Sequence, residues 1–138
     1  IAPMGVLEAA DRGVELAPQV IAKATETIEA HRSSVARAMA AGVKIAMGTD
    51  SGVTPHGQNL RELAEMSKLG MSDDQVLRSS TSVAADLLGV SEDLGSIETG
   101  KLADLVVWEG PGLDVRDMRS RIRTIIQNGT VVAGRAGD

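Results

Sequence analysis

Aromatic side chains and cysteine are almost absent from this chain. Its 138 residues contain one tryptophan (Trp108) and no Tyr, Phe or Cys. A hydrophobic core must therefore be aliphatic, and the scarcity of aromatics argues against a surface that binds bases or sugars mainly by aromatic stacking. Without thiols the chain can form neither disulfides nor thiolate metal sites, but this absence does not fix the cellular compartment.

A strong charge of one sign and a long apolar run are also missing. The formal net charge is −5, with acids and bases mixed along the chain, which argues against nucleic acid as a partner. No apolar stretch approaches the roughly 20 residues that cross a membrane. We expect a cytoplasmic protein without a membrane partner, although a chain that starts with Ile leaves a signal peptide in a longer parent open.

The first two thirds of the chain carry helical patterns. Apolar residues recur at helical spacing over residues 18–41, with a proline at the start and a glycine just beyond the end. A short helix is expected near residues 5–12. Three further helices are predicted between residues 59 and 89 from the capping residues at their starts, which are Asn59 (with Glu62), Ser72 (with Gln75) and Ser82.

Strand patterns replace helical ones towards the C-terminus. A strand is expected at 104–108, and Asn128-Gly129 lies between two β-branched runs, the strongest short-range signal for a hairpin. We therefore predict an α/β chain with a domain boundary near residue 92. Residues 1–92 form one part and residues 93–138 the other.

The segment with most chemical interest is KIAMGTDSG, residues 44–52. Residues 43–48 predict a short buried strand, and a polar loop rich in glycine follows it. In parallel α/β folds, catalytic groups lie at the C-terminal ends of strands. Asp50 has that position, where a carboxylate can bind a cation and accept a proton from metal-bound water. The spacing alone favours a turn residue that binds its own backbone over a functional carboxylate.

Other polar residues are weaker candidates for a site. Thr49 and Ser51 would orient Asp50 or the loop backbone, and a Ser nucleophile would need a base within reach. His56 is either a substrate contact, a group that supports the metal ligands, or a plain loop histidine. The remaining candidates are interpreted as structural: His31 in mid-helix, Glu62 and Glu65 as a capping and solvated face, and Arg116, Arg119, Arg121 and Arg123 as surface.

Five motifs in order resemble one known family. They are GVKIAMGTDSG, PHGQNLRELAEM, TSVAADLLGV, LGSIETGKLADLVVW and IIQNGTVV, and together they resemble the C-terminal portion of metal-dependent amidohydrolases of the imidazolonepropionase-like and Xaa-Pro dipeptidase-like branch. The resemblance implies the last βα portion of a (β/α)₈ barrel followed by strands of a small β-sandwich domain. It also implies that Asp50 is a metal ligand and general base, with one or two divalent ions, most simply zinc, and a small amide or dipeptide-like substrate.

Much of what the family needs is missing from these 138 residues. A complete barrel takes about 250 residues, and the family's His-x-His pair and its other His and Lys ligands are not found. We therefore expect a fragment that is inactive alone and that forms homo-oligomers or associates with the missing barrel. Two alternatives stay open: a non-catalytic folding or assembly element, and a dimeric aspartic protease that uses the Asp50-Ser51-Gly52 signature.

Overall fold

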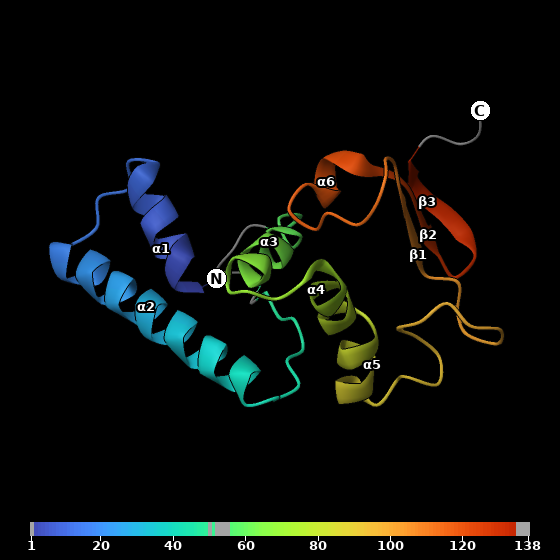
Figure 1. Ribbon diagram of the computed structural model, residues 1–138. Helices are drawn as coiled ribbons and strands as arrows, with labels where there is room; N and C mark the ends of the chain where they lie inside the picture. The colour runs from blue at the N-terminus through green and yellow to red at the C-terminus, as the bar shows by residue number, and fades with distance from the viewer. Residues whose placement is uncertain (1, 50, 52–55, 135–138) are drawn as a thin grey trace.

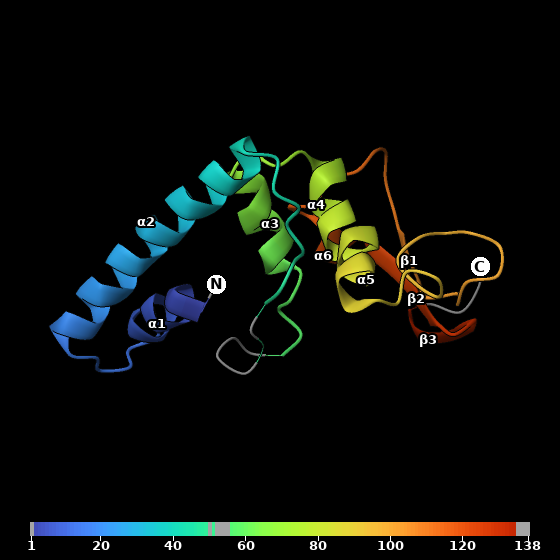
Figure 2. The ribbon, with the colours of Figure 1, turned by 90° about the horizontal axis from the view of Figure 1, so that it is seen from below.

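The computed structural model describes residues 2–49, 51 and 56–134, and Asp50 is outside this range. Helices dominate, and a small sheet lies at one end of an elongated chain (Figure 1). The α1–α2 pair lies at the opposite end, with α3, α4 and α5 between them in both views (Figure 2). The elements in chain order are α1 (Ala2–Asp11), α2 (Pro18–Ala40), α3 (Arg61–Lys68), α4 (Asp73–Ser80), α5 (Ser82–Leu88), β1 (Leu105–Trp108), α6 (Met118–Arg121), β2 (Ile122–Gln127) and β3 (Thr130–Gly134).

The two N-terminal helices agree with the sequence patterns. Helix α2 has a proline in its first turn, as predicted, and it packs along α1 with Ala24 buried. Among the described residues none of the helices combines the length and the hydropathy that a membrane span requires.

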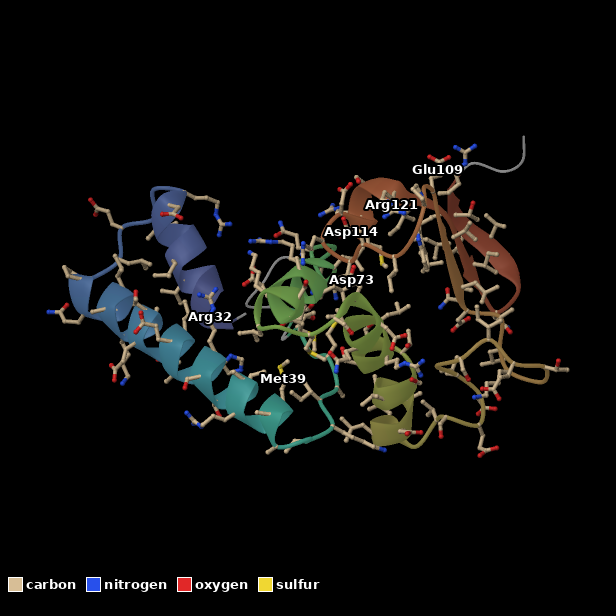
Figure 3. All side chains as sticks on the ribbon, viewed as in Figure 1. Arg32, Met39, Asp73, Glu109, Asp114 and Arg121 are labelled. Atoms are coloured by element: carbon tan, nitrogen blue, oxygen red, sulfur yellow. The ribbon has the colours of Figure 1, made fainter. Side chains whose placement is uncertain are left out.

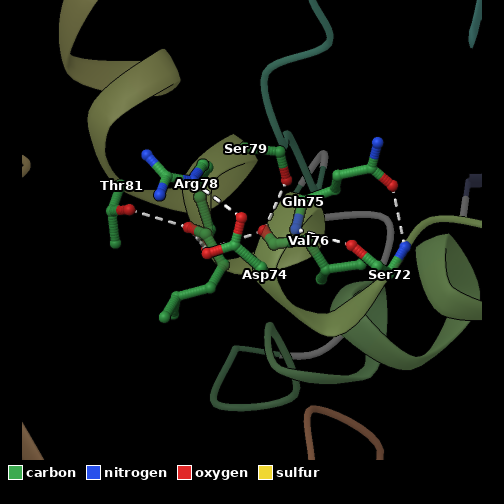
Figure 4. Close-up of polar contacts among 9 residues, drawn as sticks. Ser72, Asp74, Gln75, Val76, Arg78, Ser79 and Thr81 are labelled. Atoms are coloured by element: carbon green, nitrogen blue, oxygen red, sulfur yellow. Dashed lines mark hydrogen bonds and ion pairs between the residues drawn. The ribbon is translucent and has the colours of Figure 1, made fainter. Parts of the chain in front are cut away.

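One predicted helix cap is confirmed at the start of α4. The Gln75 N–H donates to Ser72 Oγ at 3.3 Å, and the Ser72 N–H donates to Gln75 Oε1 at 2.9 Å (Figure 4). Both orphan donors at the N-terminus are thus satisfied by two residues that lie three apart.

The other two predicted caps are wrong. Helix α3 begins at Arg61, and the Asn59 side chain donates to Ser51 Oγ at 3.3 Å instead of capping it. Helix α5 begins at Ser82 itself, with Thr81 in the cap position and without a side-chain cap bond. The Thr81 hydroxyl donates at 2.7 Å to the carbonyl of Leu77 in the preceding helix α4, so it does not cap α5.

The hydrophobic core lies between α3, α4 and the segment before α6. Its buried members are Leu63 and Met66 on α3, Val76 on α4, and Val115 and Met118 from the C-terminal part of the chain. Residues from the C-terminal part of the chain therefore pack with α3 and α4 in one hydrophobic core. The division of the chain at residue 92 remains a prediction.

The predicted strand at 43–48 does not form. Residues 43–49 adopt no regular secondary structure, although Ile45 and Met47 are half-buried and pack against the core. The Met47 N–H donates to the Ser79 carbonyl at 2.9 Å, which places this segment against α4 instead of a neighbouring strand. A strand is stable only when it hydrogen-bonds to neighbouring strands. This segment has a helix beside it instead.

The C-terminal sheet is antiparallel, in the order β1-β2-β3. The predicted hairpin is confirmed, because Gln127 pairs with Thr130 across a two-residue turn. Asn128 has a φ of 47° and Gly129 a φ of 74°, as a type I′ turn requires. The sequence gives no signal for the short helix α6, because four residues are too few to show a helical period.

We expect Gly129→Val to destabilise the hairpin by about 2 kcal/mol, because a β-branched residue is strained at positive φ. Urea unfolding at equilibrium measures the effect. The matched control is Asn128→Gly, which keeps both positive φ angles accessible and should change stability little. Equal stability of the two variants would contradict the turn assignment.

Candidate functional site

Three hydroxyl and amide side chains meet where the GTDSG segment approaches α3. Thr49 Oγ1 and Ser51 Oγ share a hydrogen bond at 2.9 Å, and Asn59 Nδ2 donates to Ser51 Oγ at 3.3 Å. The residues on both sides of Asp50 are thus tied to each other and to the start of the next helix. Asn59 was missed as a member of this cluster, because its position before α3 had suggested a cap.

The remaining expected site residues are not brought into this cluster. His56 is exposed, in a turn at residues 56–57. Asp50, the expected metal ligand and base, lies outside the described residues. In the part of the chain that the structure describes, no three His, Cys, Asp or Glu side chains are grouped so that they could hold a metal ion. The described residues therefore do not by themselves fit a metal centre.

The acidic pair on α3 is less exposed than predicted, so its interpretation as a solvated face is wrong. Glu65 accepts from Arg32 of α2 (labelled in Figure 3) at 3.3 Å and from Lys68 at 2.6 Å. Glu62 is half-buried, and its Oε2 atom has no hydrogen-bond partner among the described residues. Burial raises the pKa of Glu62 above 4.5, and the negative charge of Glu65 adds to the effect.

This raised pKa predicts how stability depends on pH. The folded chain holds the Glu62 proton more tightly than the unfolded chain, so the free energy of unfolding falls as pH rises above 4.5 through the folded pKa. Glu62→Gln should raise stability at neutral pH and flatten this dependence. Urea unfolding from about pH 4 to about pH 8 measures it, with the exposed Glu92→Gln as control. A Gln variant as pH-dependent as the parent chain would contradict the assignment.

The C-terminal arginines bind the chain's own groups. Arg121 donates from Nε to the Glu109 carbonyl at 2.6 Å and from Nη2 to the Gly112 carbonyl at 3.0 Å, beside α6 (Figure 3). Arg116 donates to Ser67 Oγ at 3.1 Å, and Arg123 forms an ion pair with Glu109. These three guanidinium groups hold the segment between β1 and β2 in place, which agrees with a structural role for Arg116, Arg121 and Arg123.

Comparison with known proteins shows the family to which the chain belongs. The profile of the amidohydrolase family matches residues 4–136. The chain therefore belongs to the amidohydrolase family. The family resemblance inferred from the five motifs is confirmed. The aspartic protease alternative is wrong, because it requires an almost wholly β chain and five of the described helices precede β1.

Three individual proteins show the extent of the similarity. The imidazolonepropionase of Shouchella clausii (strain KSM-K16) is 33% identical over 138 residues, covering 94% of this chain and 30% of the relative. A 5-methylthioadenosine/S-adenosylhomocysteine deaminase of Thermodesulfovibrio yellowstonii is 40% identical over 83 residues, 53% of this chain and 19% of the relative. A crystal structure of a Xaa-Pro dipeptidase with methionine in its active site matches with a TM-score of 0.80 and 32% identity, over 96% of this chain and 33% of that one. The chain thus spans a third or less of the length of these proteins.

Proposed function

We propose that this chain is the C-terminal part of a metal-dependent hydrolase that acts on amide or cyclic C–N bonds. In this proposal residues 1–92 end a (β/α)₈ barrel, and residues 93–138 supply strands of a small β-sandwich domain. The family match over residues 4–136 carries the proposal. The imidazolonepropionase and the Xaa-Pro dipeptidase among the similar proteins support a small amide or dipeptide-like substrate.

Within this proposal, Asp50 binds the metal and serves as general base for the hydrolytic water. Its place in the GTDSG motif supports this role, since a carboxylate suits both tasks. Thr49 and Ser51 hold the loop on either side of Asp50, and the bond from Asn59 to Ser51 supports that function. His56 is exposed, which suits a substrate contact better than a structural role.

The proposed metal is divalent, and zinc is the first choice, with one or two ions in the complete enzyme. A catalytic zinc generally takes three protein ligands, and the described residues contain no such group. The ligands beyond Asp50 are therefore assigned to parts of the complete protein outside residues 1–138. The cytoplasmic location remains a prediction.

An activity assay of the complete protein tests this proposed function directly. It should hydrolyse an imidazolone-type ring or a Xaa-Pro dipeptide, lose the activity on treatment with a chelator, and regain it when zinc is added back. A folded, zinc-loaded protein that attacks no amide or cyclic C–N bond would favour a non-catalytic assembly element instead.

For residues 1–138 alone, we expect no hydrolysis, no zinc binding tighter than about micromolar, and self-association through the sheet. Val106, Val107, Val131 and Val132 are 44–55% exposed, and exposed apolar strands pair readily with other copies. Zinc calorimetry and sedimentation over a concentration series measure both properties. Val131→Lys should reduce self-association, whereas Val14→Lys, which changes an equally exposed valine outside the sheet, should not. A monomer that binds zinc tightly would contradict this expectation.

A further inference from the structure

Two residues just before β1 hold the turn between β2 and β3. The Asn128 N–H donates to Asp104 Oδ1 at 2.7 Å, and the Gly129 N–H donates to the Ala103 carbonyl at 3.0 Å. Asn128, Gly129 and Asp104 are all exposed. Both backbone donors of the turn are therefore engaged, although the turn itself lies at the surface, at the end of the sheet (Figure 1).

The Asn128-Gly129 pair in this turn is of a kind that can react spontaneously. The backbone nitrogen that follows an asparagine can attack the side-chain amide, and a glycine at the next position offers the least obstruction because it has no Cβ. We propose that Asn128 is a site of spontaneous deamidation that the folded chain suppresses. The suppression arises because the Gly129 nitrogen, which must attack, is held by its hydrogen bond to Ala103.

The reaction needs only water. The Gly129 nitrogen forms a bond to Asn128 Cγ, the bond from Cγ to Nδ2 breaks, and Nδ2 leaves as ammonia with the proton that the Gly129 nitrogen gives up. The resulting five-membered imide then adds one water molecule at either carbonyl. Opening at one carbonyl gives aspartate, and opening at the other gives isoaspartate, so no oxidant or reductant is involved.

Either product would weaken the turn. Both place a new negative charge on the residue whose N–H binds the Asp104 carboxylate at 2.7 Å, and like charges so close repel each other. Isoaspartate also adds a carbon to the main chain of a two-residue turn, whose length fixes the pairing of β2 with β3. One modification should therefore promote further opening at this end of the sheet.

The chain supplies an internal control. Its other asparagine, Asn59, is followed by Leu60, whose side chain hinders the same attack. Trypsin releases the two asparagines in separate peptides, residues 124–135 and residues 45–61. Both rates can therefore be followed by mass spectrometry in one sample, with isoaspartate identified separately from aspartate.

The experiment compares the folded chain with the chain in urea at neutral pH. We expect Asn128 to deamidate at least about tenfold faster in urea than in the fold, since opening limits the folded rate. Asp104→Ala should raise the rate in the folded chain about tenfold, because a bond to a charged acceptor is lost. It should change nothing in urea. Asp86→Ala, which removes an exposed carboxylate on α5, should leave the Asn128 rate unaltered in both conditions.

Three results would overturn the proposal. One is equal rates for Asn128 in the folded chain and in urea. Another is an Asp104→Ala chain that is folded and reacts no faster than the parent. The third does not depend on folding: Gly129→Ala should slow the reaction severalfold in urea because its Cβ obstructs the attack, so an unchanged rate there would exclude the mechanism.

Discussion

Replacing Asp50 with Asn in the complete enzyme should lower kcat by about 10²–10⁴-fold, the usual cost of removing a general base. The exchange keeps the size of the side chain and removes the negative charge, so it separates chemistry from folding. If Asp50 also binds the metal, the zinc content per protein should fall in the same variant. Steady-state kinetics and metal analysis on the same preparation measure both effects.

The controls for this experiment come from other residues of the chain. Asp86→Asn removes an exposed carboxylate on α5 and should keep full activity. Ser51→Ala removes the hydroxyl that Thr49 and Asn59 bind, and it should lower activity less than Asp50→Asn because it changes only the support of the loop. Near-normal kcat in a folded, zinc-loaded Asp50→Asn enzyme would contradict both roles proposed for Asp50.

The parts of the fold that could be predicted from sequence are those with local causes. The capping box at Ser72 needs only Ser72 and Gln75, three residues apart, and it forms as predicted. The type I′ turn depends on the Asn128-Gly129 pair itself. Both signals are complete within a few residues, so neither required knowledge of the rest of the chain.

The predictions that failed depended on groups outside the motifs that suggested them. Asn59 could have capped α3, but Ser51, eight residues earlier, accepts its side-chain hydrogen bond instead. The prediction of a buried strand at 43–48 holds only in part, because Ile45 and Met47 are half-buried against the core and Val43 is exposed. The pattern could not show whether strands or helices would lie beside the segment, because ladder partners come from elsewhere in a protein.

The candidate site likewise contains residues that a sequence motif indicates and residues that only the structure reveals. Asp50 is a candidate because of its short, continuous GTDSG motif together with the family resemblance, and its role remains a prediction. Asn59 could not be selected in this way, since its connection to Ser51 is visible only in three dimensions. The half-burial of Glu62 was also hidden, because a glutamate three residues from another on a short helix is typical of an exposed face.

A large loss of stability is expected from the contact between the loop after α5 and that helix. A Cβ atom added at Gly95 would lie 2.6 Å from Ala85 Cβ and 3.1 Å from Ser82 Cα, and the φ of Gly95 is +91°. Gly95→Ala should therefore lower the free energy of unfolding by about 3 kcal/mol, from steric overlap together with backbone strain. Urea unfolding at equilibrium measures the loss.

Two further variants separate the overlap from the strain. Gly100 has a nearly equal φ of +98°, but an added Cβ there would meet nothing within 4 Å. Gly100→Ala should thus cost only the strain, about 1 kcal/mol. Ala85→Gly removes the atom that the new Cβ would meet, so combining it with Gly95→Ala should cost less than the sum of the two single changes, by about 1 kcal/mol. Equal losses for Gly95→Ala and Gly100→Ala, with additive behaviour in the double variant, would show that the loop does not pack against α5 at this point.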